Sequence, residues 1–230
     1  MQQPRYNIYT LIHKALRASL SQNLIELGRV DDTDTDAVTE QLANTQSLLH
    51  FCLDHLRHEN EFIHSVIFQL RQSHRLNTAD DHGQHERDIA KLLADIAHIK
   101  QLPALRRRSF LLELYRHFSL FVGENFEHMQ VEETQNAGIL WEHLTDAQIH
   151  DIHHRIVTSE TPEENMRVLM MMLPNISHSE RIEVLSGFRL AVPAEVFNGL
   201  VSSLKPLLDA KEWLKLTQSL SLAGQQEKTA

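Results

Sequence analysis

Two segments of the sequence place a histidine and a glutamate four residues apart, His55 with Glu59 and His128 with Glu132. Residues with this spacing lie on the same face of an α-helix, one turn apart, so each pair could bind one metal ion. Both pairs lie within apolar stripes that should face a protein core. Burying a carboxylate without a counter-ion costs on the order of several kcal/mol. Metal ions would remove that cost, so the two pairs predict a buried metal site.

Two further helical segments each carry one histidine on their apolar stripe, His13 and His85. Four imidazoles and two carboxylates form a mixed nitrogen and oxygen donor set, which suits iron or manganese. We therefore predict two non-haem iron ions, with manganese or zinc as substitutes. The predicted ligands are His13, His55, Glu59, His85, His128 and Glu132. His82, three residues before His85, is a less natural partner for His85 as a second ligand from the same helix, and the competing explanation is that the histidines are ordinary core histidines.

The sequence predicts that helices position these residues. The chain has only 7 Gly and 6 Pro in 230 residues, which favours long helices, and it lacks the alternation of apolar and polar residues that is typical of strands. Apolar stripes with helical spacing predict four long helices joined by short connections. The predicted ranges are 6–28, 36–73, from the turn at 77–81 to 100, and 105–144. The sequence therefore predicts an all-α fold, an antiparallel up-down four-helix bundle over residues 1–144.

Residues 145–230 contain shorter helical segments, and we expect them to form a helical C-terminal extension. Residues that commonly begin helices predict four starts in this region: Thr145-Asp146, Thr161-Pro162, Ser177 and Pro193. We expect the extension to pack on the bundle or to mediate dimerisation, so a homodimer is the predicted assembly.

The overall composition excludes several classes of protein. The formal net charge is -9 and the basic residues are scattered, which argues against a nucleic-acid partner. The sequence contains no run of about 18 apolar residues, so we predict no membrane span. The single cysteine, Cys52, fits a reducing compartment, and the N-terminal residues do not have the pattern of a secretory signal. We therefore expect a cytoplasmic protein.

The sequence around the predicted ligands resembles the hemerythrin-like, or HHE cation-binding, domain over about residues 5–145. The resemblance rests on Ile12-His13-Lys14-Ala15-Leu16-Arg17, on the segment from His55 to His64, on His85-Glu-Arg-Asp-Ile, and on His128-Met-Gln-Val-Glu132-Glu133. It implies a four-helix bundle with a non-haem di-iron centre, and the ligand set is similar to that of the di-iron proteins implicated in the repair of iron centres. In the oxygen-carrying hemerythrins the third helix supplies two histidines four residues apart, whereas here Asp81 and Ile89 stand four residues from His85.

These features predict a non-haem di-iron protein that binds or responds to dioxygen or nitric oxide, or that handles iron. Asn125 and Tyr9 are candidate hydrogen-bond donors near the open side of the metal site, and Cys52 is expected to be a small core residue. A di-iron oxidase or peroxide-consuming enzyme remains an alternative, although the pattern assigns no catalytic residue. A metal-free helical interaction protein is a third possibility.

Overall fold

The chain is all-helical, as the sequence predicts. A computed structural model describes residues 5–70 and 77–226, and within these ranges there is no strand. The chain divides into two compact units, Met1–Ser159 and Glu160–Ala230. None of the helices in the described ranges combines the length and the apolar character needed to cross a membrane.

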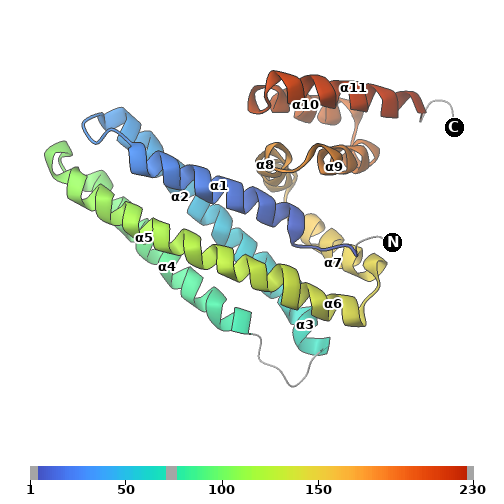
Figure 1. The fold of residues 1–230 in the computed structure, drawn as a ribbon, viewed down its shortest axis with the longest axis horizontal. Coiled ribbons are helices and arrows are strands. Elements are labelled where there is room, and N and C mark those ends of the chain that lie inside the picture. Colours follow the sequence, from blue (N-terminus) through green and yellow to red (C-terminus); the bar gives the residue numbers. More distant parts are fainter. Residues whose placement is uncertain (1–4, 71–76, 227–230) are drawn as a thin grey trace. The chain divides into compact units, whose positions relative to one another are not determined.

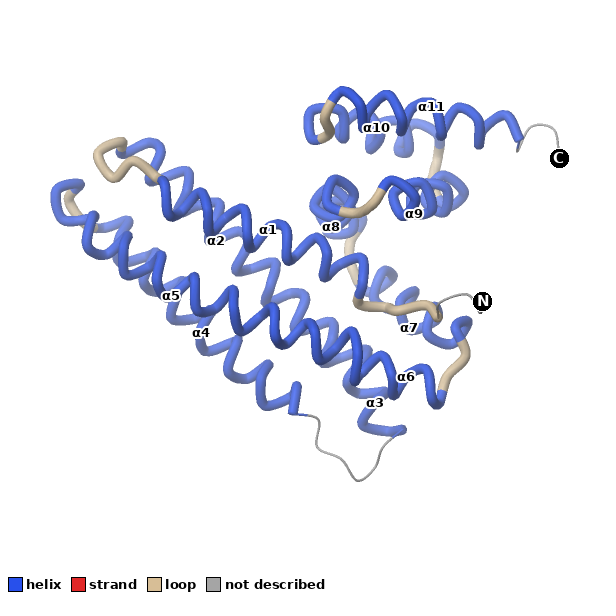
Figure 2. The backbone as a smooth tube through the Cα atoms, viewed as in Figure 1, coloured by secondary structure: helices blue, strands red, loops and turns tan. Residues whose placement is uncertain are grey.

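Four long helices form most of the first unit. They are α1 (Thr10–Arg29), α2 (Thr35–His58), α4 (Asn77–Gln101) and α5 (Ala104–Val131). They lie side by side, and each contacts two others: α1 packs on α2 and α5, and α4 packs on α2 and α5 (Figures 1 and 2). The helices α4 and α5 run in opposite directions, because the start of α4 meets the end of α5 where His82 contacts His128.

The apolar stripes read from the sequence form the core between these helices. One-sided burial explains why each stripe repeats every three or four residues, since only that face of a helix is removed from water. Fully or almost fully buried side chains include Leu16 and Leu20 of α1, Leu42 and Leu49 of α2, Ile89, Leu92, Ile96 and Ile99 of α4, and Leu114, Phe118 and Phe121 of α5. Toward the α1–α2 loop, Asn23, Gln41 and Thr45 form a buried hydrogen-bonded group, so the polar atoms in this part of the core are paired.

Two π-helical segments interrupt the second and fourth predicted helices. The segment η1 (Glu59–His64) follows α2 and leads into α3 (Ser65–Leu70), and η2 (Glu132–Asn136) follows α5 and leads into α6 (Ala137–His143). Each π-helical segment begins at one of the two predicted glutamate ligands. In a π-helix the backbone hydrogen bonds join residues five apart, so the direction of the side chains changes relative to an α-helix. Such segments are frequent at functional sites.

An apolar layer closes the first unit at the end that holds these segments. Its buried members come from the N-terminal residues, η1, α3, α6 and α7 (Asp146–Ser159): Ile8, Tyr9, Phe62, Ile63, Ile67, Ala137, Ile139, Leu140, Ile149 and Ile152. The helix α7 packs on η1. The first unit therefore ends at Ser159, later than the boundary between residues 144 and 145 that we predict from the sequence.

The second unit contains shorter helices: α8 (Pro162–Met172), α9 (His178–Ala191), α10 (Ala194–Leu204) and α11 (Ala210–Gln226), with single 3₁₀ turns at Leu173–Asn175 and Lys205–Leu207. Thr161 and Ser177 each cap a helix through a reciprocal capping box, and Pro193 precedes α10, so the predicted starts are confirmed. The buried Arg181 donates hydrogen bonds to the carbonyls of Leu173 and Ile176 and thereby holds the turn between α8 and α9.

Candidate metal centre

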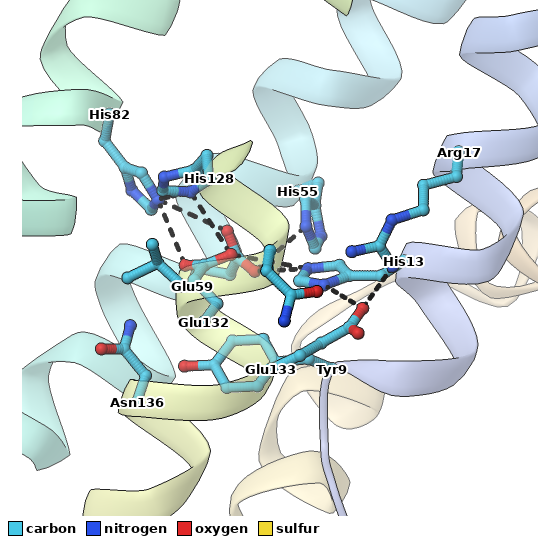
Figure 3. Close-up of polar contacts among 12 residues, drawn as sticks. Tyr9, His13, Arg17, His55, Glu59, His82, His128, Glu132, Glu133 and Asn136 are labelled. Carbon is cyan, nitrogen blue, oxygen red and sulfur yellow. Dashed lines mark hydrogen bonds and ion pairs between the residues drawn. The ribbon is translucent and has the colours of Figure 1, made fainter. Parts of the chain in front are cut away.

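Five histidines from α1, α2, η1, α4 and α5 surround the two buried carboxylates Glu59 and Glu132. Both glutamates are at most 1% exposed. His13, His55, His64, His82 and His128 all direct Nε2 toward these carboxylates, at 3.0 to 3.5 Å from the nearest carboxylate oxygens. Figure 3 shows four of these imidazoles converging on the two acids. The arrangement therefore offers nitrogen and oxygen donor atoms to a common interior point.

Glu59 connects two groups of imidazoles through its two oxygens. Its Oε1 lies 3.0 Å from Nε2 of His55 and 3.3 Å from Nε2 of His13, whereas its Oε2 lies 3.5 Å from Nε2 of His82. Glu132 is similarly divided: Oε2 lies 3.3 Å from Nε2 of His128, and Oε1 lies 3.5 Å from Nε2 of His82. Each carboxylate thus faces different imidazoles with its two oxygens, which is the arrangement required of a bridging ligand.

The donor atoms fall into two groups of metal-binding geometry that share Glu59. One group consists of Glu59, His82, His128 and Glu132, the other of His13, His55 and Glu59, and in each group one donor atom per residue lies within 4.8 Å of all the others. Oε2 of Glu59 and Oε2 of Glu132 are buried and accept no hydrogen bond from the described residues. Buried carboxylate oxygens of this kind need positive charge nearby. A pair of divalent cations fits the donor set.

Hydrogen bonds on the far side of two imidazole rings orient the rings for metal binding. Nδ1 of His13 lies 3.0 Å from Oε1 of Glu133, and Nδ1 of His82 lies 2.8 Å from Oδ1 of Asn60. Because both oxygens are acceptors, each Nδ1 carries the proton and donates it. In a neutral ring Nε2 then has a free lone pair directed at the centre, and hydrogen bonds of this kind to Nδ1 commonly orient histidines that bind metal.

Arg17 holds Glu133 in place on the side away from His13. Its guanidinium forms an ion pair with the same Oε1 atom that His13 contacts, and Asn7 donates from its side chain to the Glu133 backbone carbonyl at 2.9 Å. The chain Arg17–Glu133–His13 is visible in Figure 3. Since Glu133 is only partly buried, this chain connects the surface of the unit to the buried centre.

Two imidazole nitrogens also meet directly. Nε2 of His82 lies 2.9 Å from Nε2 of His128. With the proton of His82 donated to Asn60 from Nδ1, the Nε2 lone pair of His82 points at the other ring. Two nitrogen atoms at this distance require a proton or a metal ion that both can share. The contact is either a hydrogen bond donated by Nε2 of His128 or a pair of nitrogen donors placed for one cation.

The electrostatics of the centre favour charged carboxylates. Burial and the charge of Glu132 would raise the pKa of Glu59, but His55 and His13 outweigh them and lower it to about 2. Burial would also raise the pKa of Glu132, which contacts with His128, His64 and His82 instead hold well below its usual value. Burial would lower the pKa of His13, yet hydrogen bonds to Glu133 and Glu59 raise it to about 9. When no metal is bound, a proton on His13 therefore balances part of the charge of the acids.

The structure brings five of the six predicted ligands into these groups: His13, His55, Glu59, His128 and Glu132. The sixth, His85, is buried, and its ring lies edge-on to the ring of His128 at 4.9 Å between centroids, but it belongs to neither group. On α4 it is His82 that joins the donors. One turn of the helix separates the two histidines, and the one nearer the start of α4 lies level with the glutamates.

His64 also reaches the centre, although the sequence analysis does not include it among the ligands. Its Nε2 lies 3.0 Å from Oε1 of Glu132, and the side chain of Asn136 approaches the same nitrogen at 3.4 Å. His64 follows Glu59 by five residues, a spacing that an α-helix places on different faces and that a π-helix places close together. A spacing of five after a buried ligand is therefore the signal that could have identified it.

Of the two hydrogen-bond donors predicted near the site, Tyr9 lies beside a predicted ligand and Asn125 is directed elsewhere. Asn125 is buried, but it donates its side-chain amide to the carbonyl of Phe121 at 2.8 Å in its own helix, so it is not directed at the centre. Tyr9 is 1% exposed and lies next to His13, with 5.3 Å between ring centroids. Cys52 is buried in the core, and burial raises the pKa of its thiol to about 12, so the thiol stays protonated and unreactive.

No protein-family model matches this sequence, and a search of the curated proteins gives no significant match. The case for a metal centre therefore rests on the geometry of the side chains.

We expect the metal-free protein, prepared with a chelator, to be most stable between about pH 4.5 and 6.5. The raised pKa of His13 contributes stability that is fully present below pH 6.5 and is lost as the pH rises through about 9. The lowered pKa of Glu59 contributes stability that is present above pH 4.5 and is lost as the pH falls toward about 2. Thermal unfolding of the chelated protein across this pH range measures both effects.

The slope of Tm against pH above 6.5 separates His13 from other groups. His13→Gln should flatten this slope, whereas the control His50→Gln, at an exposed position of α2, should keep the slope of the unmodified protein. Equal slopes in all three proteins would contradict the role assigned to the His13 proton.

Glu133→Gln should weaken metal binding without removing the binding positions. The substitution removes the charge that orients His13 and pairs with Arg17, and loss of a hydrogen-bond partner behind a ligand typically costs about 10- to 100-fold in metal affinity. Competition with a chromophoric chelator measures the affinity. Glu127→Gln, at an exposed position of α5, is the matched control and should bind metal like the unmodified protein. Unchanged affinity in Glu133→Gln would rule out this positioning role.

Proposed function

We propose that the first unit is a hemerythrin-like antiparallel four-helix bundle that holds two non-haem iron ions and binds or responds to dioxygen or nitric oxide, or handles iron. The observation that carries the proposal is the sharing of buried Glu59 between two groups of imidazoles. The resemblance of the sequence to hemerythrin-like domains agrees with this geometry, since both assign the same His55–Glu59 and His128–Glu132 pairs.

Iron is the metal that the donor set favours. The centre combines imidazole nitrogens with two carboxylates and contains no thiolate, because Cys52 lies in the core. Such a set suits iron and manganese in the 2+ and 3+ states, and zinc as a substitute. His13, His55 and Glu59 would hold one ion, and His82, His128, Glu132 and Glu59 the other, with His64 within reach of the second group.

A bound pair of iron ions would supply reversible binding of dioxygen or nitric oxide, or electrons for reducing dioxygen. The chain itself supplies a dry and rigid surrounding. Tyr9, Phe62 and Ile63 belong to the apolar layer that closes this end of the unit, and this layer keeps water from the centre on that side. The hydrogen bonds to Glu133 and Asn60 keep two of the imidazoles in the orientation that binds metal.

A role in partner binding is the second candidate, and exposed apolar side chains in the second unit favour it. Leu190 is 78% exposed, and Leu207 and Leu214 are also exposed. Large exposed apolar side chains are frequent at protein interfaces. A homodimer, with the second unit mediating contact, remains the predicted assembly, and a cytoplasmic location remains a prediction from composition.

Anaerobic reconstitution of the purified protein with ferrous iron should give two ions per chain and absorption in the near-ultraviolet and visible after oxidation. His55→Ala should lose one of the two ions, because the group formed with His13 and Glu59 would keep only two ligands. The loaded variant should also melt at a lower temperature than the loaded parent, since bound metal stabilises a fold by mass action. Metal analysis and thermal unfolding measure these effects.

His50→Ala is the matched control, because His50 lies on the same helix at an exposed position. It should retain two ions per chain. A parent protein that binds no iron under these conditions, while circular dichroism shows intact helices, would overturn the proposed function.

Substitution of two neighbouring histidines of α4 tests which of them is the ligand. His82→Ala should reduce the metal content, because His82 contributes a donor atom to the group with Glu59 and Glu132. His85→Ala should keep two ions, with an altered spectrum at most, since the His85 ring contacts the His128 ring. The reverse result, with metal lost only in His85→Ala, would restore the assignment made from the sequence.

A further inference from the structure

The hydroxyl of Tyr9 is a buried polar group that the metal centre does not use. Tyr9 lies directly before α1, four residues from His13, and is 1% exposed. Its hydroxyl has no solvent contact and has no hydrogen-bond partner of normal geometry among the described residues. Proteins rarely bury a hydroxyl in this way, and a native group without a partner calls for an explanation such as a bound ligand.

The position of the ring is fixed, so the hydroxyl cannot turn toward water. The ring belongs to the apolar layer that includes Phe62, Ile63 and Leu140, and it packs against the ring of His13. A tyrosine in such a layer could be replaced by phenylalanine without loss of packing. The hydroxyl is thus an addition that packing alone does not require.

The Tyr9 hydroxyl points toward the side chain of Asn136, close to the two buried carboxylates (Figure 3). Glu132 and Glu59 are close enough to act on it electrostatically, and the side chain of Asn136 lies within its reach. Figure 3 shows the Tyr9 hydroxyl directed toward Asn136, beside the two carboxylates. Asn136 is 1% exposed and stands at the end of η2, so the π-helical segment that begins at Glu132 also places this amide.

We propose that the Tyr9 hydroxyl and the Asn136 amide form a subsite that donates hydrogen bonds to a small anion bound at the metal centre. The inference deepens the proposed function and rests on it, because the metal ions would supply the other contacts of the anion. Two neutral donors suit an anion in an apolar surrounding, where a hydrogen bond to a charged group is stronger than one to a neutral group. Tyr9 is in this sense a positioning residue for the ligand.

Azide is a suitable probe, since it is a small monoanion whose binding to the ferric or cobaltous protein can be followed by absorbance. Tyr9→Phe keeps the ring and removes only the hydroxyl. It should bind two metal ions and melt no lower than the parent, yet bind azide about 10- to 100-fold more weakly, the loss typical of one hydrogen bond to a charged ligand. Asn136→Ala should also weaken azide binding, and the two losses should not multiply in the double variant if both donors serve one anion.

Tyr115→Phe is the matched control, because Tyr115 is a partly buried tyrosine of α5 whose ring lies against Gly28, near the end of α1 opposite His13. It should leave azide affinity unchanged. Equal azide affinity in the parent and in Tyr9→Phe, or no azide binding by a metal-loaded parent, would overturn the subsite and leave the metal centre standing. Loss of metal from Tyr9→Phe, or a ferric phenolate absorption band that disappears in this variant, would make Tyr9 part of the metal-binding set and also overturn the donor role.

A parent protein that takes up no metal would overturn the proposed function and the subsite together. Metal content is therefore measured first and azide affinity second, so that the two failures are distinguished.

Discussion

Two negative charges in one apolar interior are the constraint on which the first unit depends. Glu59 and Glu132 are almost completely buried, and both burial and the charge of Glu132 act to raise the pKa of Glu59. The polar groups nearest to the two acids are imidazoles, which can supply positive charge. Imidazoles approach from α1, α2, η1, α4 and α5, and the raised pKa of His13 shows that one of them carries compensating positive charge.

The helices serve this centre through details that are not part of a regular α-helix. The turns that follow Glu59 and Glu132 are both π-helical, and they bring His64 and Asn136 to the same interior side. Beyond the imidazoles, Glu133 and Asn60 decide which ring nitrogen carries the proton. Beneath them, the apolar layer around Ile63 and Leu140 excludes water. The π-helical segments thus set the positions of the side chains, the hydrogen bonds to Glu133 and Asn60 set the protonation of two rings, and the apolar layer limits access of water.

The sequence was sufficient for the features that depend on a regular period. The apolar stripes predicted the long helices and placed His13, His55 and His128 on their inner faces, and capping residues such as Thr161 and Ser177 predicted where later helices begin. The features that were missed depend on a departure from that period or on the register between helices. The inward direction of His64 depends on the π-helical segment, which the regular helical period does not predict; only its spacing of five residues after Glu59 indicates it. The choice of His82 over His85 depends on how far α4 extends toward the glutamates, and the inclusion of α7 in the first unit depends on its packing against η1.

The centre draws on residues from nearly the whole length of the first unit. His13 stands close to the start of the chain, and Glu132 and Glu133 lie near the end of the four long helices. During synthesis, a nascent chain whose residues beyond α5 are still in the ribosome has Glu59 available but not Glu132. It also lacks Glu133, the partner of Nδ1 of His13. Such non-local contacts form late in folding, after the intervening chain has been ordered. Until then the first acid is exposed to solvent rather than buried, so metal capture is expected to follow translation of the unit rather than to guide its earliest folding steps.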